Sequence, residues 1–315
     1  MDILDEYCQR YRNWGKWGPD DELGTVNYIT PDKIVRAASL VRQGKVISLA
    51  LPFDANGPQT GRLARVNPIH QMLATGTDHV AGRQLYGGRP FPRGFGYADD
   101  TITMPLQCGT QWDGLSHIFH NGKMWNGYDA ALVTSQGAAK NGIEKLRDKV
   151  VTRGVLLDVA RAKGVASLEP GYPITVQDLE EAARFAGVTI EEGDAVLVRT
   201  GFMEYCLENG WGDYAGGNAP GLSFETAGWL YEAKIAAIAS DTWGVEVRPN
   251  ELPDSFQPLH LVMVVNMGLL VGEIFALGEL GRDCAEDGVY EFLFVAPPLP
   301  ITGAVGSPLN PLAIK

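Results

Sequence analysis

Long hydrophobic runs, paired cysteines and clustered basic residues are all missing from this sequence of 315 residues. No stretch approaches the 18 or so uncharged apolar residues of a membrane-spanning helix, so we expect none. The four cysteines (Cys8, Cys108, Cys206 and Cys284) lie far apart and form no C-x-x-C pair. This spacing argues against a disulfide framework and against a thiolate zinc site.

A secretory leader and a basic patch are also lacking. Residues 1–6 read MDILDE, without the apolar core of a signal peptide, which predicts a cytoplasmic protein. The formal net charge is −12, and the 26 lysines and arginines are scattered along the chain. Because such a field repels polyanions, we expect neither nucleic acid nor a membrane surface as a partner, and a small molecule as the substrate.

Helix-like and strand-like patterns alternate along the chain, which is typical of α/β proteins. Thr30, followed by proline, and Thr175, followed by an acidic residue at the third helical position, are each expected to cap a helix. Short apolar runs predict strands at residues 46–51, 155–159, 195–198 and 235–239.

The organisation predicted from composition is one domain spanning residues 1–315, because no Gly/Ser linker and no internal repeat is found. Residues 1–45 form an N-terminal helical extension in this prediction. Residues 54–100, rich in Gly, Pro, Arg and Asn, should be mostly loop and short strand. The proline-rich tail, residues 297–315, should be extended and packed on the surface.

The densest group of polar side chains lies in residues 107–117, QCGTQWDGLSH. Gln107, Gln111, Asp113 and His117 are all capable of metal ligation or proton transfer. Only five histidines are present, so a general base or an imidazole ligand must come from a short list. By spacing alone, this segment also fits a polar loop whose amides cap neighbouring backbone, and that alternative stays open at this point.

The same segment resembles a known signature, H-x-G-T-H-x-D-x-P-x-H, of the kynurenine formamidase and putative cyclase family. The Gly-Thr pair, the aspartate and the final histidine match in register. Residues 153–158, RGVLLD, and residues 193–201, GDAVLVRTG, resemble two further family segments. His260 and Glu273 resemble the late metal ligands of the family, and the similarity covers roughly residues 45–300.

The resemblance implies a swivelling β/β/α layered α/β domain that forms a homodimer or homotetramer. It also implies a metal-dependent hydrolase of C–N bonds other than peptide bonds, in which metal-activated water attacks an amide, cyclic imide or lactone. Carried over by position, the metal ligands are Gln107, Gln111, Asp113, His260 and Glu273. His117 would be the general base or acid, with Asp113 also part of the catalytic machinery.

Two departures from the signature affect the expected metal. Glutamine stands at both early histidine positions, and Gly114-Leu115-Ser116 replaces the proline-containing spacer. An amide oxygen is a weaker and harder ligand than imidazole, and tetrahedral zinc favours nitrogen and sulfur. We therefore expect one divalent ion, Mn²⁺ rather than Zn²⁺, bound more weakly than in the family.

Four further residues are candidates for substrate contact. Trp112 and Trp125 could form an aromatic wall, with core packing as the alternative. His120 lies three residues after His117, and its alternative is a surface position or a position behind the site. Asp241 follows the predicted strand at residues 235–239 and resembles a family aspartate that supports the site, although a residue at this place more often caps the strand end. A lyase or cyclase using the same site, or a binding protein with a degenerate metal-free site, remain alternative functions.

Overall fold

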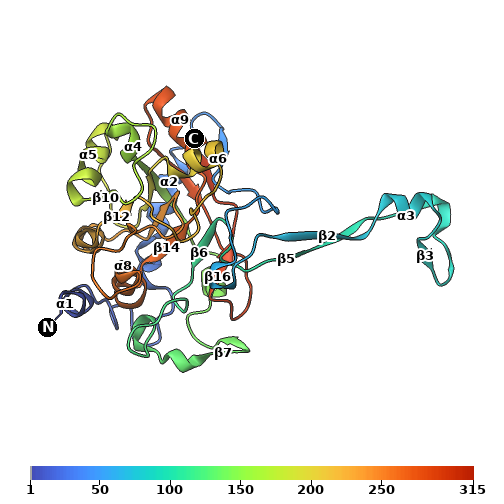
Figure 1. Ribbon diagram of the computed structural model, residues 1–315, viewed down its shortest axis with the longest axis horizontal. Helices are drawn as coiled ribbons and strands as arrows, with labels where there is room; N and C mark the ends of the chain where they lie inside the picture. Colours follow the sequence, from blue (N-terminus) through green and yellow to red (C-terminus); the bar gives the residue numbers. More distant parts are fainter. Residues whose placement is uncertain (1) are drawn as a thin grey trace.

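A mixed nine-stranded β-sheet forms the centre of the computed structural model, which describes residues 2–315 (Figure 1). The neighbouring strands β9, β11, β13 and β14 run parallel, and the strands on either side of them are antiparallel to their neighbours. In spatial order the strands are β1 (Val46–Ser48), β17 (Leu312–Ile314), β15 (Glu291–Val295), β9 (Val151–Asp158), β11 (Ala195–Arg199), β13 (Ala237–Ser240), β14 (Leu270–Glu273), β6 (Gln111–Asp113) and β16 (Gly306–Pro308). The predicted α/β class is confirmed.

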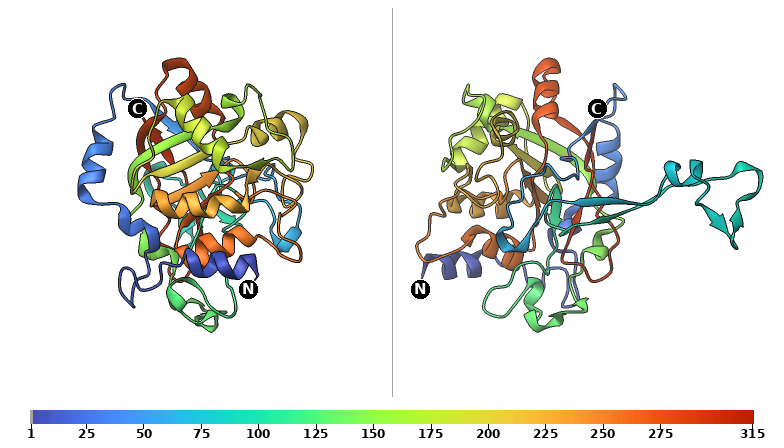
Figure 2. Two further views of the ribbon diagram at one scale, coloured as in Figure 1. Left: turned by 90° about the vertical axis from the view of Figure 1, so that its left-hand side faces the viewer. Right: turned by 45° about the vertical axis from the view of Figure 1, so that its right-hand side comes forward.

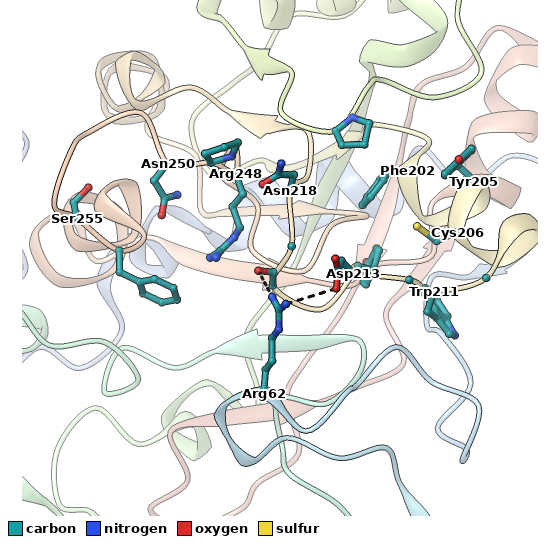
Figure 3. A pocket seen from close by; sticks show the side chains of 18 of the residues that line it. Arg62, Phe202, Tyr205, Cys206, Trp211, Asp213, Asn218, Arg248, Asn250 and Ser255 are labelled. Atoms are coloured by element: carbon teal, nitrogen blue, oxygen red, sulfur yellow. Dashed lines mark hydrogen bonds and ion pairs between the residues drawn. The ribbon is translucent and has the colours of Figure 1, made fainter.

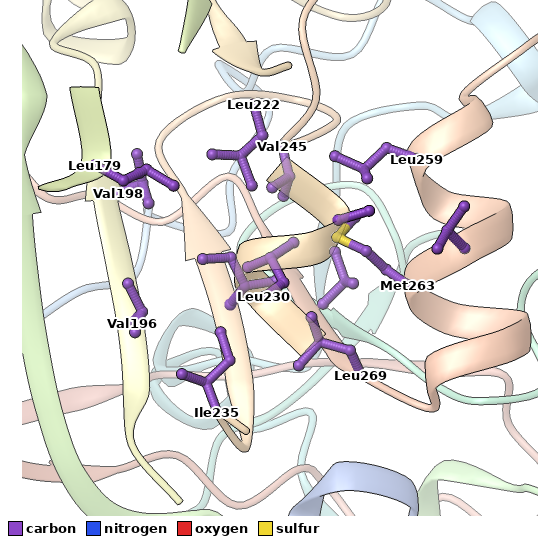
Figure 4. Close-up of a cluster of buried hydrophobic side chains, with 14 of the residues drawn as sticks. Leu179, Val196, Val198, Leu222, Leu230, Ile235, Val245, Leu259, Met263 and Leu269 are labelled. Atoms are coloured by element: carbon purple, nitrogen blue, oxygen red, sulfur yellow. The ribbon is translucent and has the colours of Figure 1, made fainter. Parts of the chain in front are cut away.

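Both faces of this sheet are buried, which explains why its central strands are almost continuously apolar. One face is covered by α5 (Val176–Ala186), α7 (Ala227–Ala233) and the π-helix η8 (Leu261–Met267). Figure 4 shows Leu179, Leu230 and Met263 of these helices in one buried cluster with Val196 and Val198 of β11. The other face packs against α9 (Gly278–Asp287) and the 3₁₀ turn η6 (Ile143–Leu146).

Shorter elements connect the strands and surround this core (Figure 2). The helices are α1 (Ile3–Arg10), α2 (Pro31–Ala38), α4 (Val159–Ala162), α6 (Phe202–Asn209) and α8 (Pro258–His260). The 3₁₀ turns are η1 (Gly24–Tyr28), η2 (Arg62–Ala64), η3 (Pro92–Gly94), η4 (Trp125–Gly127), η5 (Ala130–Leu132) and η7 (Phe224–Thr226). Two small strand pairs are β7 (Val133–Thr134) with β8 (Gly137–Ala138), and β10 (Pro173–Ile174) with β12 (Gly221–Leu222). No helix among residues 2–315 is long and apolar enough to cross a membrane.

The two predicted helix caps are present. The Thr30 hydroxyl accepts a hydrogen bond from the backbone N–H of Lys33 at the start of α2. Thr175 and Asp178 form a reciprocal capping box at the start of α5, which ends at Gly187 in the left-handed conformation. Local side chains therefore satisfy the N–H groups that a helix leaves without partners, as expected from the sequence.

An arm projects far from the body of the molecule (Figures 1 and 2). It consists of β2 (Ile69–Ala74) paired with β5 (Asp99–Thr103), and of a tip that carries α3 (Gly76–Val80), β3 (Leu85–Tyr86) and β4 (Arg89–Pro90). Large apolar side chains on it are open to solvent: Leu73 is 70%, Val80 87% and Tyr86 74% exposed. The segment is loop and short strand, as predicted, but its gathering into one arm was not foreseen.

The C-terminal tail is extended, but the expectation that it packs on the surface was wrong. Its residues supply β16 and β17, and Ser307 and Ala313 are fully buried. Gly306 makes this possible beside β6, since a Cβ there would lie 2.6 Å from Gln107 Nε2 and 2.8 Å from the Trp112 carbonyl oxygen. Strands of three residues are too short to show an alternation of apolar and polar residues, so the sequence did not predict β16 and β17.

Candidate metal centre

The register of three antiparallel strands brings the polar residues of the signature to one face of the sheet. Glu273 of β14 stands opposite Gln111 of β6, while Asp113 stands opposite Val271 on one side and Gly306 of β16 on the other. Directly paired residues of antiparallel strands point to the same face, and successive residues alternate. Gln111, Asp113 and Glu273 therefore share one face, and Trp112 points to the other.

Three buried side chains form a compact group with potential ligand atoms within 4.8 Å of one another: Asp113, His260 and Glu273. Strands β6 and β14 supply the carboxylates, and the short helix α8 supplies the imidazole. His260 Nε2 lies 3.3 Å from Glu273 Oε1. The structure thus brings together three of the five predicted ligands from sequence positions up to 160 apart.

The two glutamines lie on the same face of the sheet as this group. The Gln111 amide nitrogen donates to Glu273 Oε2 at 2.8 Å. The Gln107 amide nitrogen lies against Gly306, the residue of β16 that is paired with Asp113. Gln107 Nε2, Gln111 Oε1 and Asp113 Oδ1 are buried without a hydrogen-bond partner among residues 2–315. Buried polar atoms are rarely left without partners, and the unpartnered oxygens suit a cation.

A second carboxylate, Glu246, holds His260 in place and was not predicted from the sequence. His260 Nδ1 donates to Glu246 Oε1 at 2.5 Å, and the backbone N–H of His260 donates to the same oxygen at 3.0 Å. A carboxylate on one imidazole nitrogen leaves the other free to bind metal, and it fixes the ring orientation. The only available signal was a lone acidic residue between Val245 and Val247.

The electrostatics of the group favour a bound cation. Burial and the charge of Asp113 raise the pKa of Glu273 to about 7. Burial alone would lower the pKa of His260, but hydrogen bonds to Glu246 and Glu273 raise it to about 10. The carboxyl groups of Asp113, Glu246 and Glu273 lie around His260, and the buried protein interior stabilises their negative charge poorly. A divalent ion at the centre would neutralise this charge.

His117 lies at the edge of the group, with its side chain 19% exposed. Its Nε2 is 3.8 Å from Asp113 Oδ1 and 3.5 Å from Arg65 Nη2. Burial lowers the pKa of His117, and the nearby charges of Arg65 and His260 lower it further, against the opposite effect of Asp113. The imidazole is therefore neutral at neutral pH and able to accept a proton. Arg65, which follows η2 in the chain, was also missed from the sequence.

The four predicted substrate-contact residues are not brought into this group. Trp112 is buried on the opposite face, where its Nε1 donates to the Ala296 carbonyl, and Trp125 is buried with its Nε1 on Asp21. The Asp241 carboxylate accepts hydrogen bonds from the backbone at the start of α6. His120 lines a separate small cavity with Cys8. These placements correspond to core packing, capping and a surface position.

Comparison with known proteins supports the resemblance of the signature. The sequence matches the family model described as "Putative cyclase" over residues 47–247. A crystal structure described as that of a novel cyclase is 42% identical, with a TM-score of 0.88, covering 97% of this chain and 100% of that chain. No curated protein matches the sequence.

Two isatin hydrolases share the fold. Isatin hydrolase A from Labrenzia aggregata, bound to benzyl benzoate, is 18% identical with a TM-score of 0.61, covering 90% of this chain and 97% of that chain. Isatin hydrolase A from Ralstonia solanacearum is 16% identical with a TM-score of 0.60, covering 85% and 91%. At these identities the comparison shows a shared fold. Together, the matched family model and the 42% identical cyclase structure show that this chain belongs to the putative cyclase family.

Proposed function

We propose that this chain is a metal-dependent hydrolase that cleaves the C–N bond of an amide or cyclic imide, or the ester bond of a lactone. The observation that carries the proposal is the buried group of Asp113, His260 and Glu273, with unpartnered oxygens on Asp113 and Gln111. Membership of the cyclase family supports it. The shared fold of the isatin hydrolases is compatible with a ring amide as the substrate.

The residues present fit one divalent ion. Asp113, Glu273 and His260 through Nε2 would hold it, and the amide oxygens of Gln107 and Gln111 would add further oxygen ligands. Because the donor set is rich in oxygen, Mn²⁺ suits it better than Zn²⁺. Such an ion supplies Lewis acidity, which polarises a carbonyl group and lowers the pKa of water.

The protein's own groups would then handle the proton. Neutral His117 accepts a proton from the attacking water at Nε2, and Asp113 Oδ1, 3.8 Å away, stabilises the resulting imidazolium. The positive charge of Arg65, 3.5 Å from the same nitrogen, keeps the imidazolium acidic. The proton can therefore pass to the leaving nitrogen or oxygen when the bond breaks. Glu246 keeps His260 oriented throughout.

Elemental analysis by plasma mass spectrometry tests the metal centre directly. We expect about one Mn or Zn per chain in the purified protein, and none in Asp113→Ala. Asp148→Ala is the matched control, because the Asp148 side chain is 70% exposed. Protein that takes up no metal even after incubation with Mn²⁺ would contradict the proposal and favour a metal-free binding role.

Turnover distinguishes the two metal-dependent alternatives. Cyclic imides and lactones are offered to the metal-loaded protein with a pH indicator, because their hydrolysis releases acid. Amides are followed instead by the amine that they release, since the carboxylate and ammonium products leave the pH unchanged. Metal binding with neither acid release nor amine release from these classes would favour the lyase or cyclase alternative.

We also infer that the chain works as a homodimer or homotetramer joined through the arm. A two-stranded hairpin is only marginally stable by itself, and several apolar side chains of this arm remain largely exposed to solvent. Residues 79–98 contain three arginines and no acidic residue, whereas the whole chain has a net charge of −12. The acidic body of a second copy is therefore complementary in charge to the arm.

A further inference from the structure

One arginine near the metal centre has no partner. Arg248 Nη1 is buried and has no hydrogen-bond partner among residues 2–315. Its guanidinium lies over the Trp243 ring, 5.7 Å from the ring centroid, and over the Phe256 ring at 5.1 Å. Burial lowers the pKa of Arg248 and the charge of Arg62 lowers it further, against the opposite effect of Glu246 and Glu273. Leaving a buried donor of a charged group without an acceptor is costly.

Two other largely buried arginines of the described chain do have acidic partners. Arg153 forms ion pairs with Asp194 and Glu291, and Arg199 forms ion pairs with Asp158 and Glu204. An acidic chain has no shortage of carboxylates to place beside a buried guanidinium. The lack of an acidic partner therefore distinguishes Arg248 from these two arginines.

The acidic group nearest in the chain, Glu246, cannot serve as the partner. Its Oε1 accepts from the backbone and ring nitrogens of His260, and its Oε2 accepts from the backbone N–H of Leu259 and from the Asn250 amide. Both oxygens are thus committed to holding α8 and the metal-binding imidazole. Among residues 2–315, Glu246 therefore supplies no oxygen that accepts from Arg248 Nη1.

Arg248 lines a large cavity that a small molecule can enter (Figure 3). The cavity has a volume of about 980 Å³, and its walls include the aromatic side chains of Phe202, Trp211 and Phe256. In Figure 3 the Arg248 side chain points into the cavity toward Arg62, which is bound to Asp213 and to the Gly216 carbonyl. Aromatic walls with a few charged donors are typical of sites for small organic ligands.

A continuous set of contacts joins this cavity to the metal centre. His117 contacts Arg65 at 3.5 Å, and the Arg65 guanidinium lies 5.2 Å from the centroid of the Trp243 ring that also contacts Arg248. Trp243 itself is buried with an unpartnered Nε1. The groups left open between the metal centre and the cavity, Arg248 Nη1 and Trp243 Nε1, are hydrogen-bond donors. Such a set favours a ligand group that only accepts hydrogen bonds.

We propose that Arg248 binds a carboxylate of the substrate in this cavity, so that the substrate is an aromatic or otherwise apolar molecule with a carboxylate apart from the bond that is cleaved. The guanidinium would bind it by charge-assisted hydrogen bonds, and the aromatic walls would hold the apolar body. The role of this ligand as the substrate rests on the proposed hydrolase function, whereas the binding of an aromatic carboxylate at Arg248 is independent of that function.

Calorimetric titration of the metal-free protein tests the site without turnover and without a metal that could itself bind the probe. Benzoate is the probe, and benzamide, of the same shape but neutral, is its control. We expect benzoate to bind about tenfold more tightly than benzamide, the equivalent of one hydrogen bond to a charged group. Arg248→Met should remove this difference, whereas Arg184→Met, at an exposed position on α5, should keep it.

Further variants separate this role from a structural one. Arg248→Lys should restore part of the benzoate affinity because it keeps the charge, and added salt should weaken binding to it. In the absence of benzoate, Arg248→Met should unfold at a higher temperature than the natural protein, since it removes a buried group without a partner. A purely structural arginine would show the opposite shift.

The binding measurements test the carboxylate site and do not depend on catalytic activity. Equal affinity for benzoate and benzamide, no benzoate binding, or unchanged benzoate binding in Arg248→Met would each overturn the proposal. Asp113→Ala, which lacks the proposed metal site, should still bind benzoate. If Asp113→Ala and the natural protein are equally inactive but both bind benzoate through Arg248, the hydrolase proposal fails and the carboxylate site stands.

Discussion

At the scale of single residues, the candidate metal centre is shaped by groups that lie behind the three candidate ligands as well as by the ligands themselves. The carboxylate oxygens of Glu246 accept hydrogen bonds from the His260 ring and from the backbone of α8. No sequence motif marks this residue. Arg65 and Asp113 act on His117 with opposite effects on its pKa. These residues decide the orientation and the charge of the two imidazoles.

Glu246→Gln should weaken metal binding by about 10–100-fold, because the amide no longer fixes the His260 ring as a carboxylate does. Competition with a chelator measures the affinity. Glu251→Gln, a nearby acidic residue whose side chain accepts only from the backbone N–H of Phe224, is the control. An unchanged affinity in Glu246→Gln would show that Glu246 does not support metal binding through His260.

His117→Asn should reduce kcat by roughly 10²–10⁴-fold, the usual contribution of a general base, with little change in metal content. The side chain lies at the edge of the group and not in the apolar core, so the thermal midpoint should change little. His120→Asn is the matched control. If His117→Asn keeps full activity on a substrate that the natural protein hydrolyses, another group takes the proton.

At the scale of single elements, helix α5 shows which features can be predicted from nearby residues in the sequence. Its start, its capping box and its end at Gly187 follow from side chains within a few residues, so they could be predicted. The strands β16 and β17 could not. Their positions depend on pairing with β6, β1 and β15, which are remote in the sequence.

Asp178→Asn should destabilise the protein by about 0.5–2 kcal/mol near neutral pH, the range measured for lost helix caps. Burial alone would raise the pKa of Asp178, but Lys163 and the Thr175 backbone N–H hold it below its ordinary value of 3.8. A carboxyl group with a lowered folded-state pKa stabilises the protein above its unfolded-state pKa, and this contribution is lost as the pH falls through the folded-state pKa.

Urea unfolding at several pH values checks this sign. The difference in unfolding free energy between the natural protein and Asp178→Asn should be full above pH 5 or so, and should shrink as the pH falls below 3.8. Gln177→Ala, at the neighbouring exposed position, should show no such pH dependence. A difference that grows toward low pH would contradict the assignment.

At the scale of the whole molecule, the arm and the body have different roles. The body buries both faces of its sheet, whereas the arm exposes apolar side chains on a hairpin joined to the body only at its base. Ile69 and Thr103 are paired at the base of the hairpin, so the chain can be rejoined there by a short turn.

Replacing residues 70–102 by two glycines should therefore leave a folded body of lower oligomeric mass. Size-exclusion chromatography with light scattering measures the mass, and circular dichroism checks the fold. The charge-reversing change of Arg83, Arg89 and Arg93 to glutamate should act in the same direction, because it repels an acidic second copy. An unchanged mass in both variants would show that the chain assembles through another surface, or not at all.

The sequence by itself determined the α/β class, the two capped helices and the family, because these depend on local patterns and on a signature of eleven residues. The predicted roles of the five ligands and of His117 stay predictions, as do the expected ion and the cytoplasmic location. Only the tertiary structure decided which side chains meet: strand alternation turned Trp112 away from Asp113, and long-range packing placed Glu246, Arg65 and Arg248 around the centre. Such contacts join segments far apart in the chain, and their geometry is set by the register of the sheet, which no short stretch of sequence specifies.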